Sequence, residues 1–136
     1  MRASLTPQEA LIYAMITVSA VDKMMTDAEL ARIGSIVQQL PAFQGQGKDW
    51  LVRCSEECGA VLRDGGLDKV LEMIGGALPR HLRETAYVLA AEVAASDLRV
   101  QLEEVRFLEL LADTLHLNKL TCAALERAAK ARHQQV

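Results

Sequence analysis

Two stretches of the chain repeat the same order of apolar and polar positions, 75 residues apart. Residues 9–40 and 84–115 each begin with a run that is apolar on almost every side. Each then passes through a short connection with an aspartate and continues as an amphipathic segment. A helix that is apolar all round belongs in the centre of a globular protein. The pattern therefore predicts two helical hairpins, each with one central helix.

The two stretches align without a gap, which predicts an internal repeat. The matched pairs are Glu9 and Glu84, Val18 and Val93, Ala20 and Ala95, Asp22 and Asp97, Glu29 and Glu104, and Leu40 and Leu115. A chain of 136 residues is one ordinary domain with enough length to bury a core. We therefore expect a single all-α domain over residues 1–136. Its fold should be a compact bundle of about seven helices built from two pseudo-symmetric helical-hairpin halves.

Capping signals set the expected bounds of the first two helices. Residues 6–9, TPQE, and residues 26–29, TDAE, are capping boxes. The first helix should run from about Pro7 to Met24, and the second should end before Pro41. Residues 41–49 contain Pro and two Gly without periodicity, so we expect a loop there. No segment alternates with period two, and no strand is predicted.

Five further helices are expected in the rest of the chain. The third should be capped by Asp49 and end at residues 64–66 (DGG), and the fourth should run from Leu67 to Ile74. The fifth should start at Pro79 and the sixth near Glu104. The seventh should be capped by Asn118 and run from Lys119 to about Arg132. A disordered tail should follow the last helix.

Composition and charge narrow the class of protein. The net charge of −3, with no run of Lys or Arg, argues against a nucleic-acid-binding surface. The apolar runs at 10–21 and 85–96 are too short to span a bilayer, so no direct membrane insertion is expected. Because the first run recurs inside the chain, we do not interpret it as a signal peptide. Three cysteines without a secretory signal indicate reduced thiols and a cytoplasmic location.

Four repeated carboxylates are the main chemical signal. Helical phase puts Glu104 on the apolar face of Val105, Leu108, Leu111 and Leu115, and Glu29 on the face of Ile33, Ile36 and Leu40. Asp22 and Asp97 follow helix C-termini, where the dipole disfavours negative charge. Charged groups that break local rules tend to mark functional positions.

We therefore expect Asp22, Glu29, Asp97 and Glu104 to converge and bind a hard divalent cation. Calcium is favoured, and Mg²⁺ or Mn²⁺ would accept the same oxygen ligands. The alternative is a metal-independent helical adaptor in which the carboxylates are caps and salt bridges. Glu29 is explained by capping Thr26, and Lys23 and Arg99 adjoin the aspartates. Gln101 stands in the place of Thr26 in the second copy, so no Ser/Thr capping box explains Glu104.

The stretch AVDKMMTDAELARIGSIVQQLPAF, residues 20–43, resembles the TerB-like tellurite-resistance family, and the likeness extends over nearly the whole chain. The resemblance implies two pseudo-symmetric helical halves with gathered acidic residues as a metal site. It also implies a role in tellurite resistance and stress response beside other stress-response proteins, membrane-associated and calcium-linked partners among them. The family commonly has Gly after each Asp. This chain has Lys23 and Leu98 there, which predicts weak metal affinity.

Other candidate sites are weaker. Cys54 and Cys58 lie one helical turn apart among apolar residues, so packing is favoured over metal binding. No His stands near either acidic motif, and no nucleophile has a base beside it. We expect a binding module and not an enzyme. The competing hypotheses are a metal-dependent hydrolase, whose carboxylates would activate water, and an adaptor whose acidic face meets a basic partner.

Overall fold

The computed structural model describes residues 4–21, 25–96 and 101–136. Within these ranges the chain forms six α-helices and two 3₁₀ helices, with no strand. The α-helices are α1 (Pro7–Ala20), α2 (Asp27–Gln39), α3 (Lys48–Ala77), α4 (Arg83–Ala95), α5 (Leu102–Thr114) and α6 (Lys119–Arg132); the 3₁₀ helices are η1 (Pro41–Phe43) and η2 (Arg80–Leu82). The predicted all-α class is confirmed.

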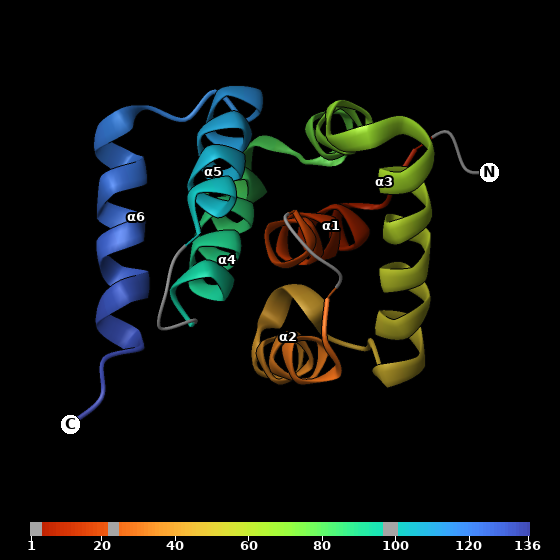
Figure 1. Ribbon diagram of the computed structural model, residues 1–136, viewed down its shortest axis with the longest axis horizontal. Helices are drawn as coiled ribbons and strands as arrows, with labels where there is room; N and C mark the ends of the chain where they lie inside the picture. The colour runs from red at the N-terminus through yellow and green to blue at the C-terminus, as the bar shows by residue number, and fades with distance from the viewer. Residues whose placement is uncertain (1–3, 22–24, 97–100) are drawn as a thin grey trace.

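Helix α1 forms the centre of the fold. It packs against α3 and α4 along its length and also contacts α2 and α5 (Figure 1). Nearly all of its residues are buried, and Ala14 and Val18 have no exposed surface. Helix α4 is buried at Leu89 and Val93 and packs on α1. The prediction that these two apolar helices are central is therefore confirmed.

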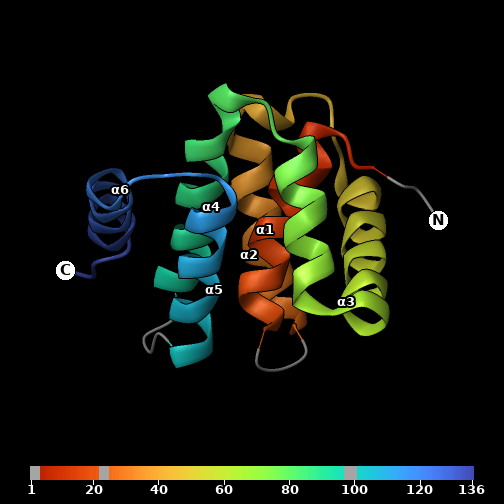
Figure 2. The same cartoon turned by 90° about the horizontal axis from the view of Figure 1, so that it is seen from above.

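The second helices of the two hairpins have the same length. A shift of 75 residues carries α2, Asp27–Gln39, onto α5, Leu102–Thr114. The C-terminal ends of α1 and α4 and the N-terminal ends of α2 and α5 lie at one side of the molecule (Figure 2). We call this side the hairpin edge. Helix α1 ends at Ala20, short of the predicted end at Met24, and Met24 lies outside the described residues.

The predicted third and fourth helices are consecutive parts of α3. The chain kinks at Gly66, which has φ 73° and ψ −174°. A positive φ is readily adopted only by glycine, so the break falls in the predicted place. However, helical turns continue on both sides of it, and the described residues form six α-helices where we predicted about seven.

The start of α3 differs from the prediction. The helix begins at Lys48, and Gly47, whose backbone is extended, occupies the N-cap position. Asp49 is therefore the second helical residue and not the cap. Its carboxylate still lies in the first turn, where the helix dipole favours a negative charge. The preceding residues are not all loop, because η1 forms at Pro41–Phe43.

Helix α6 has the predicted bounds and packs on the outer side of α4 (Figure 1). The Asn118 side chain accepts a hydrogen bond from the Thr121 N–H at 2.8 Å, which confirms the predicted cap. Arg132 Nε donates to Glu92 Oε1 at 2.5 Å and ties the end of α6 to α4. Among the described residues, no helix combines the length and the apolar character needed to cross a membrane.

Candidate functional site

The structure describes two of the four predicted ligands, Glu29 and Glu104. Asp22 and Asp97 lie outside the described residues. Glu29 and Glu104 are both buried, with 8% and 3% of their surface exposed. Each is the third residue of its helix, at the hairpin edge. The structure therefore bears on the glutamate half of the predicted site.

Both glutamates cap their own helices. Glu29 Oε1 accepts a hydrogen bond from the Thr26 N–H at 2.8 Å, and Thr26 Oγ1 accepts one from the Glu29 N–H at 3.1 Å. Glu104 Oε1 accepts from the Gln101 N–H at 2.8 Å. The N-cap is not Ser or Thr, as the sequence indicates, but Gln101 and Glu104 still form a capping box. The glutamate half of a capping box needs only the backbone N–H of the N-cap residue, which Gln101 supplies as well as Thr does.

The apolar face that carries Glu104 is largely as predicted. Leu108, Leu111 and Leu115 are buried beside it. Val105 was predicted to join them but is 43% exposed, whereas Phe107 is fully buried. The other charged residues of α5 face solvent; they are Glu103, Arg106, Glu109 and Asp113.

A hydrogen bond joins the two hairpins at the hairpin edge. Arg32 Nη1, one turn after Glu29 on α2, donates to Ser96 Oγ at 2.8 Å. Ser96 is the C-cap of α4 and precedes Asp97 in the chain, and its hydroxyl donates to the Val93 carbonyl at 2.7 Å. The start of α2 and the end of α4 are therefore neighbours. The bond also places a guanidinium at the edge where the carboxylates of both repeats were predicted.

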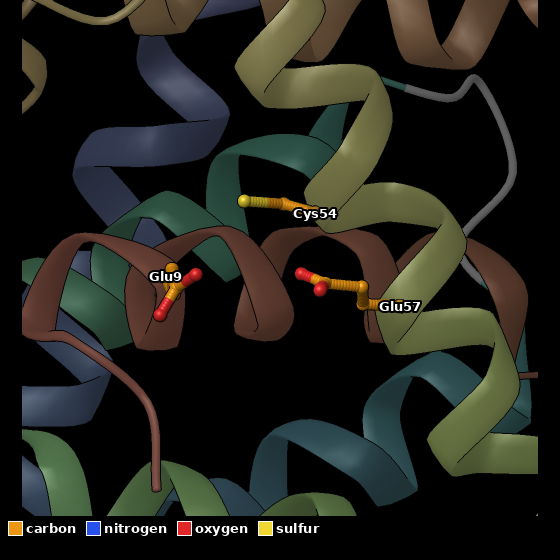
Figure 3. Close-up of side chains that lie close together, drawn as sticks. All are labelled: Glu9, Cys54 and Glu57. Atoms are coloured by element: carbon orange, nitrogen blue, oxygen red, sulfur yellow. The ribbon is translucent and has the colours of Figure 1, made fainter. Parts of the chain in front are cut away.

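A second group of possible ligands was missed by sequence reasoning. Glu9 from α1 and Cys54 and Glu57 from α3 each offer one ligand atom, and these atoms lie within 4.8 Å of one another (Figure 3). Glu9 and Cys54 are buried, whereas Glu57 is exposed. The spacing of Cys54 and Glu57 puts them on one helix face and was a usable signal. The approach of Glu9 from another helix is a tertiary fact.

These three side chains line a pocket of about 400 Å³. Its other lining residues are Thr6, Gln8, Gln46, Trp50 and Arg53. Glu9 is held in place because its Oε1 accepts a hydrogen bond from the Thr6 N–H at 2.9 Å. The Gln46 side chain, which also lines the pocket, donates to Gln8 Oε1 at 2.6 Å. The pocket therefore has ordered walls and carries two carboxylates and a thiol.

Cys58 has a different environment from Cys54. Its sulfur lies 3.6 Å from Thr17 Oγ1 in the core, and burial raises the pKa of the thiol to about 11. Cys58 therefore packs in the core, whereas Cys54 belongs to the three clustered side chains. All three cysteines are described and form no disulfide.

Tyr13 lies close to this negative group. Burial raises the pKa of the Tyr13 hydroxyl most, and the neighbouring Cys58, Glu57, Glu9 and Cys54 raise it further. A phenol beside several acidic groups stays protonated, because each nearby negative charge disfavours ionisation. The Tyr13 hydroxyl is therefore a neutral group beside the clustered side chains.

A hollow of about 370 Å³ lies between α2 and the first half of α3. Its apolar lining includes Leu30, Val37, Leu51 and Val52, and its rim carries Asp27 and Lys48. Hollows with apolar walls and a few polar groups at the rim suit the binding of small molecules or peptide side chains.

No family model, no curated protein and no solved structure matches the chain. Functional inference therefore depends on the fold and on the two groups of side chains described above.

Proposed function

We propose that the chain is a TerB-like stress-response module that binds a divalent cation and docks on partner proteins. In this proposal its two hairpin halves are pseudo-symmetric. Asp22, Glu29, Asp97 and Glu104 hold the ion at the hairpin edge, with calcium favoured over Mg²⁺ and Mn²⁺. The observation that carries the proposal is the matched position of Glu29 and Glu104, both buried at the third position of equivalent helices at one edge.

The chemistry of the glutamates fits a hard cation. Calcium takes six to eight oxygen ligands, and four carboxylates can supply enough of them without every oxygen engaging. The caps fix the orientation of Glu29 and Glu104, since one oxygen of each accepts a backbone N–H. Pre-oriented ligands lose less side-chain entropy when an ion binds. Carboxylates brought together also repel each other at neutral pH, and a cation relieves that repulsion.

A metal-independent adaptor is the second candidate, and the capping of Glu104 favours it. The hydrogen bond to Gln101 explains a buried glutamate at this position without an ion. The Arg32 guanidinium, held by Ser96, can also balance negative charge at the hairpin edge. Under both candidates the hollow between α2 and α3 offers apolar walls to a partner segment.

Thermal unfolding with added ions separates the two candidates. An ion that binds the folded state raises the melting temperature, so calcium or Mn²⁺ at about millimolar concentration should stabilise the chain relative to EDTA. The double variant Asp22→Asn with Asp97→Asn should lose the increase. If no ion changes the melting temperature, the metal-independent adaptor is the remaining candidate. Turnover in a phosphatase and esterase screen, abolished by Asp97→Asn, would instead indicate the metal-dependent hydrolase.

A further inference from the structure

We propose that Glu9, Cys54 and Glu57 form a separate site for a borderline divalent metal such as Zn²⁺, with one thiolate and two carboxylate ligands. This site does not depend on the hairpin edge, because its ligands come from α1 and α3 and include none of the four repeated carboxylates. Three observations carry it: the mutual distances of the ligand atoms, the pocket beside them, and the identity of the donors.

The distances require only small movements of the side chains. Zinc binds sulfur at about 2.3 Å and oxygen at about 2.0 Å, so tetrahedral ligands lie about 3.3 to 3.5 Å apart. The three ligand atoms are within 4.8 Å of one another before any ion is bound. Glu57 is exposed, whereas Glu9 and Cys54 are buried, so the adjustment on metal binding falls mainly on the Glu57 side chain. The carboxylate of Glu57 extends from α3 toward Glu9 (Figure 3).

The cap on Glu9 prepares this ligand and does not compete with it. Its Oε1 accepts the Thr6 N–H at 2.9 Å, so the carboxylate is oriented by the start of its own helix. Hydrogen bonds of this kind fix the geometry of metal ligands in known sites and increase their affinity. A carboxylate has two oxygens and about four acceptor positions, so one capping bond and one metal bond are compatible.

The charges also favour a cation at this place. Glu9 and Glu57 bring two negative charges close together, and the Cys54 thiol becomes a third when its proton leaves to solvent on metal binding. A divalent ion then leaves the cluster with a net charge of about −1. The Arg53 side chain, which lines the same pocket, brings a positive charge to balance the remainder. The two carboxylates repel each other, and a cation between them relieves that repulsion.

The donors select the type of metal. A thiolate favours Zn²⁺ and related ions over Ca²⁺ and Mg²⁺, which prefer oxygen ligands only. Three protein ligands leave the fourth tetrahedral position for water from the pocket, as in exchangeable zinc sites. The two sites therefore differ in preference: the hairpin edge suits hard ions, and the α1–α3 site suits borderline ions.

Titration of the full chain with Co²⁺ tests this site, because a thiolate bound to cobalt gives a charge-transfer band that carboxylates alone do not give. One equivalent should produce the band, and Zn²⁺ should abolish it by displacement. Cys54→Ala should lose it. Cys58→Ala is the matched control, since Cys58 is buried one turn further along the same helix, and this variant should keep it. Calcium should not compete.

Two carboxylate variants complete the test. Glu57→Gln changes an exposed residue, and Glu9→Gln keeps an oxygen that can accept the Thr6 N–H. Each should weaken cobalt binding about tenfold or more, as loss of a ligand charge does in other sites. Absence of the band in the native chain would overturn the proposal, and so would a band that persists in Cys54→Ala. If Cys54→Ala fails to fold by circular dichroism, unchanged cobalt affinity in Glu57→Gln would overturn it. The hairpin-edge site is tested by the calcium-dependent melting temperature and the α1–α3 site by the cobalt band. One proposal can therefore be contradicted without the other.

Discussion

Arg32 donates a hydrogen bond to Ser96 across the two hairpins, with 2.8 Å between Nη1 and Oγ. The two residues are 64 positions apart in the chain, and the bond is exposed to solvent. An exposed hydrogen bond contributes little to stability, so its main consequence is positional. It holds a positive charge at the edge where Glu29 and Glu104 cap their helices. In the proposed site this charge opposes cation binding.

Replacing Arg32 should therefore increase the affinity for calcium. Removal of a unit positive charge several ångströms from a cation near the surface is worth about 0.5 to 1 kcal/mol, so Arg32→Ala should bind calcium about two- to fivefold more tightly. Arg106→Ala removes an exposed arginine from the outer face of α5 and is the matched control. If both variants bind calcium with the same affinity, the charge of Arg32 does not act on the proposed site.

The cap on α5 predicts a graded effect on stability. Glu104→Ala removes the acceptor for the Gln101 N–H and should lower the free energy of unfolding by about 1 kcal/mol. Glu104→Gln keeps a side-chain oxygen and should cost less. Glu103→Ala, at the exposed neighbouring position, should stay within about 0.5 kcal/mol of the native chain. Denaturant unfolding in EDTA measures all three without the effect of an ion. A loss at Glu103 equal to that at Glu104 would contradict the cap.

The repeat predicted the hairpins but not their side-chain contacts. Helix α2 follows the predicted cap at Thr26 and ends before Pro41, whereas α5 begins at Leu102, ahead of the predicted start near Glu104. The central place of α1 follows from a run with no polar face. These features are local, and local periodicity records them. The capping of Glu104 is also local. A capping signature limited to Ser or Thr at the N-cap does not include Gln101, whose backbone N–H nevertheless donates to Glu104.

The α1–α3 site was outside the reach of pattern reasoning. Glu9 and Cys54 are 45 residues apart, and only the packing of α1 on α3 brings them together. The apolar neighbours of Cys54 indicated burial, which is correct at 1% exposure. Cys54 is buried and also lines the polar pocket between α1 and α3. A one-dimensional pattern cannot distinguish a core position from one beside a pocket.

Neighbouring glycines at the end of α3 give a matched pair for its packing on α5. A Cβ at Gly75 would lie 2.9 Å from Thr114 Cγ2, and Thr114 is held by its hydrogen bond to the Leu110 carbonyl at 2.9 Å. A Cβ at Gly76 would meet nothing within 4 Å. Gly75→Ala should destabilise the chain by about 1 to 3 kcal/mol through overpacking. Gly76→Ala should stabilise it by about 0.4 to 1 kcal/mol. Chemical unfolding checks both, and the same sign for the two variants would contradict this packing.

Cys58 predicts a loss of stability at alkaline pH. Burial raises the pKa of its thiol from 9.0 to about 11 in the folded chain. Above pH 9 the unfolded chain releases this proton while the folded chain keeps it, so unfolding becomes more favourable as the pH rises. The contribution of Cys58 is complete below about pH 9 and is lost between about pH 9 and 11, by about 2 to 3 kcal/mol in all. Unfolding free energies across this range should fall less steeply in Cys58→Ala. If the unfolding free energy of Cys58→Ala falls as steeply with pH as that of the native chain, other groups cause the loss of stability.

Calorimetric titration with calcium tests the proposed hairpin-edge site most directly. Four chains are compared: the native sequence, Asp22→Asn with Asp97→Asn, Glu29→Gln with Glu104→Gln, and Glu103→Gln with Glu109→Gln as the control on the exposed face. The glutamine pair keeps oxygens that can cap both helices, so its fold should be retained. The proposal predicts one calcium per chain in the native and control sequences, and no measurable heat in the other two. No heat in the native chain at about millimolar calcium, or equal heat in all four, would contradict it and leave Glu29 and Glu104 as helix caps.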